Sequence, residues 1–360
     1  MSFVLPVYHA PDFSEAQFQN APDVVFQPAP RDGVAPEGYH ATSIYPEYFK
    51  VGGQWLLAEE SRMDCVPVLR NGKIAVVEFR NLKEGDPVAV GRTEDASEGI
   101  YVYPWGFEEE KGARDAFSFR QSRSRETAYS MDYDSIYELL RHEKDHGRIL
   151  WVMGPACAFD HDARAAFAAL VRGGYVHGLL AGNALATHDL EASYIGTALG
   201  QDIYTQKSMP NGHYNHIDTL NAIRGCGSTA AFVEAGKVTD GIIYECVKHQ
   251  IPYVLVGSVR DDGPLPEGYG NVYEGQDAMR ALVKDATTVI CMASTLHTVA
   301  TGNMTPSYRV VDGVVRPVYF YSVDVSEFAV NKLRDRGSLS VRTIVTNVQD
   351  FVVNVQKGVL

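Results

Sequence analysis

Six short runs of apolar and β-branched residues in the last two thirds of the chain constrain its fold more than any other feature. Strands of a parallel sheet are buried on both faces, so they read as continuous apolar runs with helices in the connections between them. The segments between these runs are mostly long enough to form such helices. We therefore predict an α/β fold with a Rossmann-like parallel sheet whose strands are residues 148–153, 175–181, 253–257, 287–293, 318–324 and 342–348.

Small and polar residues follow each of these runs. In open parallel sheets, ligands bind outside the carboxyl ends of the strands, so this arrangement favours a ligand site at that edge. Turn chemistry alone would also place some glycine and serine there. The residues concerned are Gly154-Pro155, Gly182-Asn183, Ser258 with Arg260-Asp261-Asp262, Ser294-Thr295, Asp324, and Thr346-Asn347.

The part of the chain before residue 104 has a different pattern, with short β-type runs separated by turn signals. Asn71-Gly72 and Gly52-Gly53 can take the positive φ angles of a two-residue hairpin turn. A helix is predicted from Asp132 to His146, with Ile136, Leu139 and Leu140 on its apolar side. We predict four regions: an N-terminal extension (1–22), a small β-rich domain (23–103), a charged linker (104–130) and an α/β catalytic domain (131–360).

Composition excludes several classes of protein. The formal net charge of -13 disfavours nucleic-acid binding, because an acidic surface repels a phosphate backbone. No apolar stretch is long enough to cross a membrane, and the start of the chain does not resemble a secretory signal, so we expect a cytoplasmic protein. The five cysteines never form a CxxC pair, so we expect reduced, mostly buried thiols: Cys65, Cys157, Cys226, Cys246 and Cys291.

The usual nucleotide-binding motifs, GxGxxG and GxxxxGK[ST], do not occur in the chain. A nucleotide would therefore be held by other loops, of which residues 179–189, 256–266 and 294–304 are the best candidates. Their glycines and serines let backbone N–H groups approach a pyrophosphate, and a following helix adds its dipole. Asp324 could bind a ribose diol, or be a solvated residue at a strand end.

The densest polar cluster lies at residues 211–228. Two histidines three residues apart, His213 and His216, could suggest a metal site, but no third ligand stands at a recognisable spacing and no metal is predicted. Neutral imidazoles can exchange a proton near pH 7, so a pocket with acid/base groups is the favoured interpretation. A capped helix start with structural histidines is the alternative. The other polar residues of the cluster are Asn215, Asp218, Asn221 and Arg224.

Residues 260–264 place one arginine beside two acids on a loop stiffened by prolines. Arg260 could bind a substrate carboxylate while Asp261 or Asp262 holds an ammonium group, a combination that suits an amino acid. A surface turn whose charges satisfy one another is the alternative.

Several long motifs together resemble one family. The segments GLLAGNALATHDLE, GHYNHIDTLNAIRGCGS, GSVRDDGPLP, TLHTVATGNM and NKLRDRGS with the following IVTNV are similar to the archaeal-type ornithine cyclodeaminases. The same module is called the LOR/SDH conserved region and forms the C-terminal part of the arginine dihydrolase–ornithine cyclodeaminase fusion. The resemblance runs from about Gly154 to the C-terminus, with a weaker match over the β-rich part through PAPRDGVAPEGYHATSIYP and ESRMDC (60–65).

The resemblance implies an NAD-binding domain related in fold to deoxyhypusine synthase. It also implies conversion of L-ornithine, or a close diamino acid, to L-proline with ammonia release and recycling of NAD. Two segments differ from the pattern expected for the family, namely Phe159-Asp160-His161 and Asp324-Val325-Ser326-Glu327, and both lie at strand ends where they could change the substrate.

The resemblance also assigns residue roles. Catalytic roles fall to Asp262, Asp261, His213, His216 and Lys332, and substrate contacts to Arg260, Asn215 and Asn183. The cofactor contacts are Gly182, Asn183, Gly257, Ser258, His297, Gly302, Asn303, Met304 and Asp324. A homo-oligomer, dimer or tetramer, is expected from related folds.

Other functions stay open at this point. An amino-acid or opine-type dehydrogenase would use the same cofactor but accumulate NADH. A non-catalytic NAD-binding sensor would be stabilised by NAD without turnover. A transferase like deoxyhypusine synthase is the remaining alternative.

Overall fold

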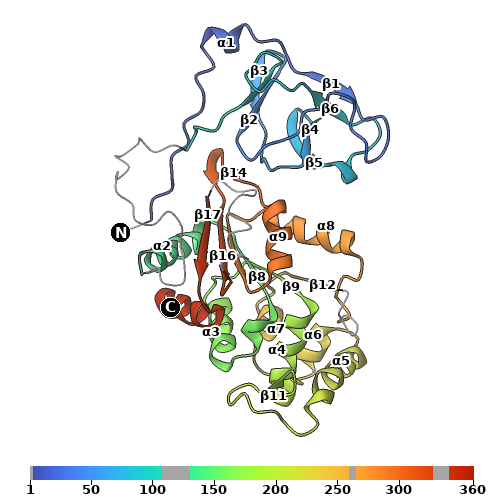
Figure 1. The fold of residues 1–360 in the computed structure, drawn as a ribbon, viewed down its shortest axis with the longest axis vertical. Helices are drawn as coiled ribbons and strands as arrows, with labels where there is room; N and C mark the ends of the chain where they lie inside the picture. Colours follow the sequence, from blue (N-terminus) through green and yellow to red (C-terminus); the bar gives the residue numbers. More distant parts are fainter. Residues whose placement is uncertain (1–2, 108–129, 259–264, 327–339) are drawn as a thin grey trace.

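The computed structural model describes residues 3–107, 130–258, 265–326 and 340–360. Its largest element is a six-stranded parallel sheet (Figure 1), which confirms the predicted α/β fold. All six predicted runs are strands of this sheet, and each pair of neighbours is parallel. In spatial order the strands are β12 (Tyr253–Val256), β9 (Gly178–Gly182), β8 (Ile149–Met153), β13 (Thr288–Met292), β16 (Tyr319–Asp324) and β17 (Ser340–Val345).

Two strand boundaries differ from the prediction by three residues, and the others agree to within two. The β9 strand begins three residues later than expected because Tyr175 still belongs to the end of the preceding helix, where its amide donates to the Leu170 carbonyl. The β17 strand ends before residue 346 because Asn347 caps the last helix, its side chain accepting from the amides of Gln349 and Asp350.

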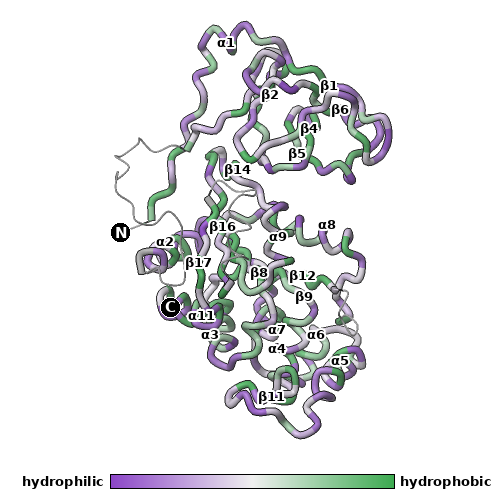
Figure 2. Tube along the Cα trace, in the orientation of Figure 1, coloured by the Kyte–Doolittle hydropathy of each residue, from purple (hydrophilic) through white to green (hydrophobic). Residues whose placement is uncertain are grey.

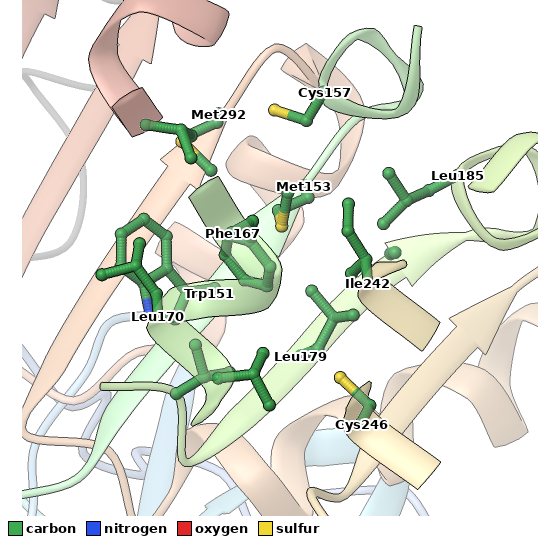
Figure 3. Close-up of a cluster of buried hydrophobic side chains, with 14 of the residues drawn as sticks. Trp151, Met153, Cys157, Phe167, Leu170, Leu179, Leu185, Ile242, Cys246 and Met292 are labelled. Carbon is green, nitrogen blue, oxygen red and sulfur yellow. The ribbon is translucent and has the colours of Figure 1, made fainter. Parts of the chain in front are cut away.

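Helices cover both faces of the sheet. On one face, Trp151, Leu179 and Ile290 contribute to a large apolar cluster (Figure 3). The helices that complete this cluster are α2 (Ser130–His146), α3 (His161–Arg172), α4 (Asn183–Ile195), α5 (Asn215–Cys226), α6 (Thr229–Glu234), α7 (Ile242–Lys248) and α11 (Val348–Val359).

On the opposite face, alternate residues of the same strands, such as Val152 and Leu180, pack against α8 (Val272–Val283) and α9 (Thr295–Met304). The central strands β9, β8 and β13 are therefore buried on both sides, which is why their sequences are apolar almost throughout (Figure 2). Of the five cysteines, all free, Cys226 is partly exposed and the others are buried. Among the described residues, none of the helices has the length and apolar character needed to cross a membrane.

The β-rich part consists of two small antiparallel sheets. One contains β1 (Val25–Pro28), β6 (Pro87–Val90), β4 (Cys65–Arg70) and β5 (Lys73–Glu78), and the other β3 (Gln54–Leu57), β2 (Glu47–Val51) and β7 (Ile100–Val102). Both predicted hairpins are confirmed: Asn71-Gly72 joins β4 to β5, Gly52-Gly53 joins β2 to β3, and all four turn residues have positive φ. The short helix α1 (Ala16–Gln19) precedes these sheets.

The β-rich part lies at the end of the parallel sheet where the strands begin (Figure 1). It contacts the segment after α9, where the hydroxyl of Tyr308 donates to the Ala58 carbonyl at 2.7 Å. It also contacts α8, where Arg280 pairs with Glu78 and Asp277 pairs with Arg80. The hairpin of β14 (Tyr308–Val311) and β15 (Val314–Pro317) connects this region to β16. The opposite edge of the sheet, where the strands end, is therefore away from these contacts.

A buried ion pair holds together α3, α4 and α7, three of the helices that cover one face of the sheet. The carboxylate of Asp189 on α4 accepts from Nε of Arg164 on α3 at 2.6 Å. The same carboxylate accepts from the backbone amides of Ile242 and Ile243 at the start of α7. Asp189 is fully buried, so three donors, one on α3 and two at the start of α7, depend on one side chain.

We expect Asp189→Ala to lower the free energy of unfolding by about 3–5 kcal/mol, because it removes the buried carboxylate that holds Nε of Arg164 and two backbone amides, and leaves the guanidinium only the largely exposed Asp240 carboxylate. The exposed acid of α3, Asp162, is the control: its partner His161 is also exposed, so Asp162→Ala should have little effect. Thermal unfolding of the two variants beside the wild type measures the difference. Equal melting temperatures for the two variants would contradict the role given to Asp189.

Candidate functional site

The strand order places a switch point between β8 and β13. From β8 the chain builds outward through β9 to β12, and it then returns to the other side of β8 to build β13, β16 and β17. At such a point the connections leave neighbouring strands in opposite directions, which opens a crevice at the carboxyl edge of the sheet. Three helical elements begin around it: the short 3-10 helix η2 (Pro155–Ala158), α4 and α9.

The ends of β8 and β13 are in direct main-chain contact. The amide of Gly154 donates to the Met292 carbonyl at 2.8 Å. A Cβ atom at position 154 would lie 1.9 Å from the carbonyl oxygen of Ala293, so only glycine fits there. Ala293 itself has a φ of 51°, in the left-handed region, and turns the chain sharply into α9.

The first turn of α9 meets the first turn of α4 across this edge. The His297 ring bonds through Nδ1 to the Ser294 hydroxyl at 2.8 Å. A Cβ atom on Gly182, which precedes α4, would lie 3.1 Å from Cε1 of the same ring. The structure thus brings together Gly182 and His297, two of the predicted cofactor contacts.

Asn183, the first residue of α4, is buried and uses its side chain to fix another loop. Its Oδ1 accepts from the amide of Leu265 at 2.7 Å. This bond links the start of α4 to the connection that leaves β12. Gly257 and Ser258, also predicted cofactor contacts, stand at the beginning of that connection.

The other predicted cofactor contacts are distributed differently. Asp324 ends β16, where its carboxylate accepts from the Ser326 amide at 2.9 Å and its backbone carbonyl accepts from the Thr346 amide. Gly302, Asn303 and Met304 lie at the end of α9. Because this helix has ten residues, its end lies roughly 15 Å from its start at the carboxyl edge. Met304 is buried there in the apolar cluster beneath α8.

Four of the predicted catalytic and substrate-binding residues lie outside the described part of the chain: Arg260, Asp261, Asp262 and Lys332. Their roles therefore remain predictions.

The polar cluster at 211–228 forms the 3-10 helix η3 (Gly212–Tyr214) and α5. His213 is exposed, and its ring lies against that of Tyr214, with centroids 4.2 Å apart. Asn215 turns inward and donates from Nδ2 to the Thr197 hydroxyl at 2.8 Å. The His216 ring lies 6.2 Å from that of His188 on α4. Within the described residues, no group of three His, Cys, Asp or Glu side chains is arranged to hold a metal ion.

His188 and Glu191 on α4 lie next to these residues: His188 is near His216, and Glu191 shares Thr197 with Asn215. Neither residue was among the predicted site residues. Nδ1 of His188 bonds to Oε2 of Glu191 at 3.0 Å. The other side of the His188 ring meets Phe159, which follows η2, at a centroid distance of 5.2 Å. A histidine and a glutamate three residues apart face the same side of a helix. The sequence THDLE could therefore have predicted this His188–Glu191 pair.

Glu191 is fully buried and accepts several hydrogen bonds. The Thr197 hydroxyl and the Gly200 amide donate to Oε1 at 2.7 and 3.0 Å, and the Leu199 amide donates to Oε2. Burial alone would raise the pKa of Glu191, but the bonds from His188, Thr197 and Gly200 outweigh it, so the pKa lies below its usual value. The carboxylate is therefore charged at neutral pH and fixes both His188 and the turn between β10 (Thr197–Ala198) and β11 (Gln201–Asp202).

Two family models match the chain in succession. Residues 135–355 match the model described as "Arginine dihydrolase ArgZ-like, C-terminal, Rossmann fold", and residues 46–128 match the first region of the same C-terminal part.

Named proteins and solved structures align with most of the chain. The ornithine cyclodeaminase of Methanopyrus kandleri is 38% identical over 338 residues, which cover 93% of this chain and 78% of that protein. The crystal structure of a LOR/SDH protein from Methanococcus maripaludis S2 has a TM-score of 0.84 at 35% identity, covering 94% of this chain and 98% of that one. The ternary complex of AgrE with ornithine and NAD⁺ has a TM-score of 0.59 at 32% identity, covering 95% of this chain and 46% of AgrE. The similarity thus includes both the β-rich part and the parallel sheet.

We expect Gly154→Ala to destabilise the protein by about 1–3 kcal/mol or more, because the added methyl group overlaps the Ala293 carbonyl and pushes β8 and β13 apart. Gly225→Ala is the matched control. Gly225 lies in α5 with open space around its Cβ position, so alanine there should stabilise by about 0.4–1 kcal/mol. Thermal unfolding tests both, and an unchanged melting temperature for Gly154→Ala would contradict the close approach of the two strand ends.

Proposed function

The chain belongs to the family of the ArgZ-like C-terminal domains and the archaeal ornithine cyclodeaminases, and from this premise we propose that it is an NAD-dependent enzyme of the ornithine cyclodeaminase type. The observation that carries the proposal is the agreement in sequence and fold with AgrE, whose structure was determined with ornithine and NAD⁺ bound. The alignment covers 95% of the present chain, and the Rossmann-fold family model over residues 135–355 includes all six strands of the parallel sheet.

The residues at that edge suit a dinucleotide. Gly154 and Gly182 lie at the ends of the adjacent strands β8 and β9. Because glycine has no side chain, a ligand can approach the main chain closely at both positions. The N-termini of α4 and α9, 13 and 10 residues long, begin beside them and present backbone amides and a positive dipole. We propose that Gly182, Asn183, Ser294 and His297 hold the cofactor, with Asp324 at a ribose hydroxyl.

Bound NAD⁺ would supply a hydride acceptor for the substrate α-carbon and later return the hydride to the cyclic product. The chain's own residues then have three tasks: to orient the amino acid, to exclude water and to move protons. We assign proton transfer and substrate contact to the cluster of α4 and α5, where Asn215 bonds to Thr197 and His216 lies beside His188. The product of L-ornithine on this pathway is L-proline, with release of ammonia.

Phe159 is the position where the substrate preference could differ from that of the relatives. Of the three residues that depart from the expected pattern here, Asp160 caps α3 by accepting from the Ala163 amide, and His161 pairs with Asp162. The ring of Phe159, by contrast, packs on His188 within the polar cluster. We therefore propose ornithine or a close diamino acid as the substrate.

Purified protein incubated with NAD⁺ and a series of diamino acids tests the proposal, with ammonia, NADH and products measured together. We expect ammonia release and proline formation from ornithine without net accumulation of NADH. A steady rise of NADH would instead identify a dehydrogenase, and thermal stabilisation by NAD⁺ without turnover would identify a sensor. Size measurement in solution tests the proposed homo-oligomer, and fractionation of the source cells tests the proposed cytoplasmic location.

For the cofactor site, we expect His297→Ala to weaken NAD⁺ binding roughly tenfold, the size expected for one lost hydrogen bond to a ligand. Leu296→Ala is the control, because Leu296 lies on the same helical turn with its side chain 74% exposed. Calorimetric titration with NAD⁺ measures both affinities. Equal affinities in the two variants would remove His297 from the cofactor site.

A further inference from the structure

We propose that His188, held by Glu191, is the residue that accepts the proton from the substrate amino group, a role that the motifs had assigned to His213 and His216. This inference rests on the proposed function. It is carried by a buried imidazole–carboxylate pair whose ring contacts Phe159, after η2, and lies near His216 in the first turn of α5.

The first step concerns the orientation of the ring. The carboxylate of Glu191 bonds to Nδ1 of His188, and a charged carboxylate is an acceptor only. The proton of the neutral imidazole therefore lies on Nδ1, and Nε2 carries the free electron pair. A carboxylate in this position also stabilises the imidazolium that forms once Nε2 has accepted a proton.

The second step concerns rigidity. Glu191 accepts from Thr197, Leu199 and Gly200 in addition to His188, so it cannot turn away from the imidazole without losing several hydrogen bonds. Thr197 is in turn held by Asn215 of α5. The ring orientation is thus fixed by two helices and a turn, as a group that must present one nitrogen to the substrate requires.

The third step concerns location. His188 stands five residues after Asn183, so about 7.5 Å of helix separates it from the start of α4 at the carboxyl edge. Its ring is 5.2 Å from that of Phe159, on the segment that follows β8 and η2, and 6.2 Å from that of His216 on α5. The His188 side chain is 9% exposed, so the ring is largely shielded from bulk water.

The other predicted histidine, His213, lacks these features. It is exposed and stacks on Tyr214, and none of the carboxylates in the described part of the chain lies within ion-pair distance of it. His40 does form a similar buried pair, with Glu47 at 3.0 Å, but it lies in the β-rich part at the other end of the sheet. His40 therefore provides a control with matched chemistry and burial.

The proposed proton transfer balances as follows. The substrate α-carbon loses its hydrogen with the bonding electron pair to NAD⁺, and the α-ammonium group loses one proton as the C=N bond forms. Nε2 of His188 accepts that proton. The neutral δ-amine then attacks the α-carbon, and a proton passes from the new ring nitrogen to the departing amino group, so that ammonia leaves and a cyclic iminium remains. That iminium takes the hydride back, and the imidazolium returns its proton to the ring nitrogen of the product, so that His188 is neutral again and the cofactor is restored to NAD⁺.

The test compares His188→Ala with His40→Ala in the full-length protein. We expect His188→Ala to lower kcat for ornithine by roughly 10²–10⁴-fold, while KM and the NAD⁺ affinity change less than about threefold. Added imidazole should restore part of the lost activity, because it can occupy the cavity and accept the proton. His40→Ala should lower the melting temperature comparably and leave kcat close to that of the wild type.

For the positioning role of Glu191, we expect Glu191→Gln to lower kcat with little change in KM, and Glu191→Asp to retain more activity because the charge is kept. Circular dichroism and NAD⁺ titration verify that each variant is folded and binds cofactor.

Three outcomes would overturn the inference alone: wild-type kcat in His188→Ala, an equal loss of kcat in His40→Ala, or a loss that imidazole does not reverse. Absence of ammonia release by the wild-type protein would overturn the proposed function, and this inference with it.

Discussion

The buried pair of Asp189 and Arg164 is the interaction on which the arrangement of the candidate site depends. It joins α3 to α4, and through the amides of Ile242 and Ile243 it also fixes the start of α7. Since α4 begins at the carboxyl edge of β9, its anchoring also fixes the position of Gly182 and Asn183. The same helix also carries His188 and Glu191. Buried polar residues of α4 therefore contribute both to the stability of the fold and to the proposed chemistry.

The site itself is assembled at the place where the sheet changes its order of construction. Segments that are 139 residues apart in the chain, Gly154 and Ala293, come into contact there because β8 and β13 are neighbours. The starts of α4 and α9 then converge through Gly182 and His297. No single motif could contain such a site, which explains why the chain has neither of the usual nucleotide-binding fingerprints.

The sequence predicted the sheet well and the site only in part. Strands buried on both faces must be apolar throughout, so the sequences of Ile149–Met153 and Thr288–Met292 predicted strands. Asn71-Gly72 predicted a hairpin because both residues can adopt positive φ angles. The polar residues of α4 were harder to interpret, because burial of His188 and Glu191 depends on partners such as Thr197 and Gly200 that come together only in the fold. Likewise, TLHTVATGNM was one motif in the sequence, yet its helix separates His297 from Met304.

The turn after β8 contains two positions with opposite tolerance to change. At Gly154 the Ala293 carbonyl leaves no room for a side chain, whereas five residues later Phe159 contributes its ring to the cluster and its carbonyl to the Gln206 side chain. Any residue at 159 can supply that carbonyl, so its side chain can be exchanged while the main-chain path is kept. For enzyme engineering, position 159 is therefore the place to change the surroundings of His188, and position 154 is the one to leave untouched.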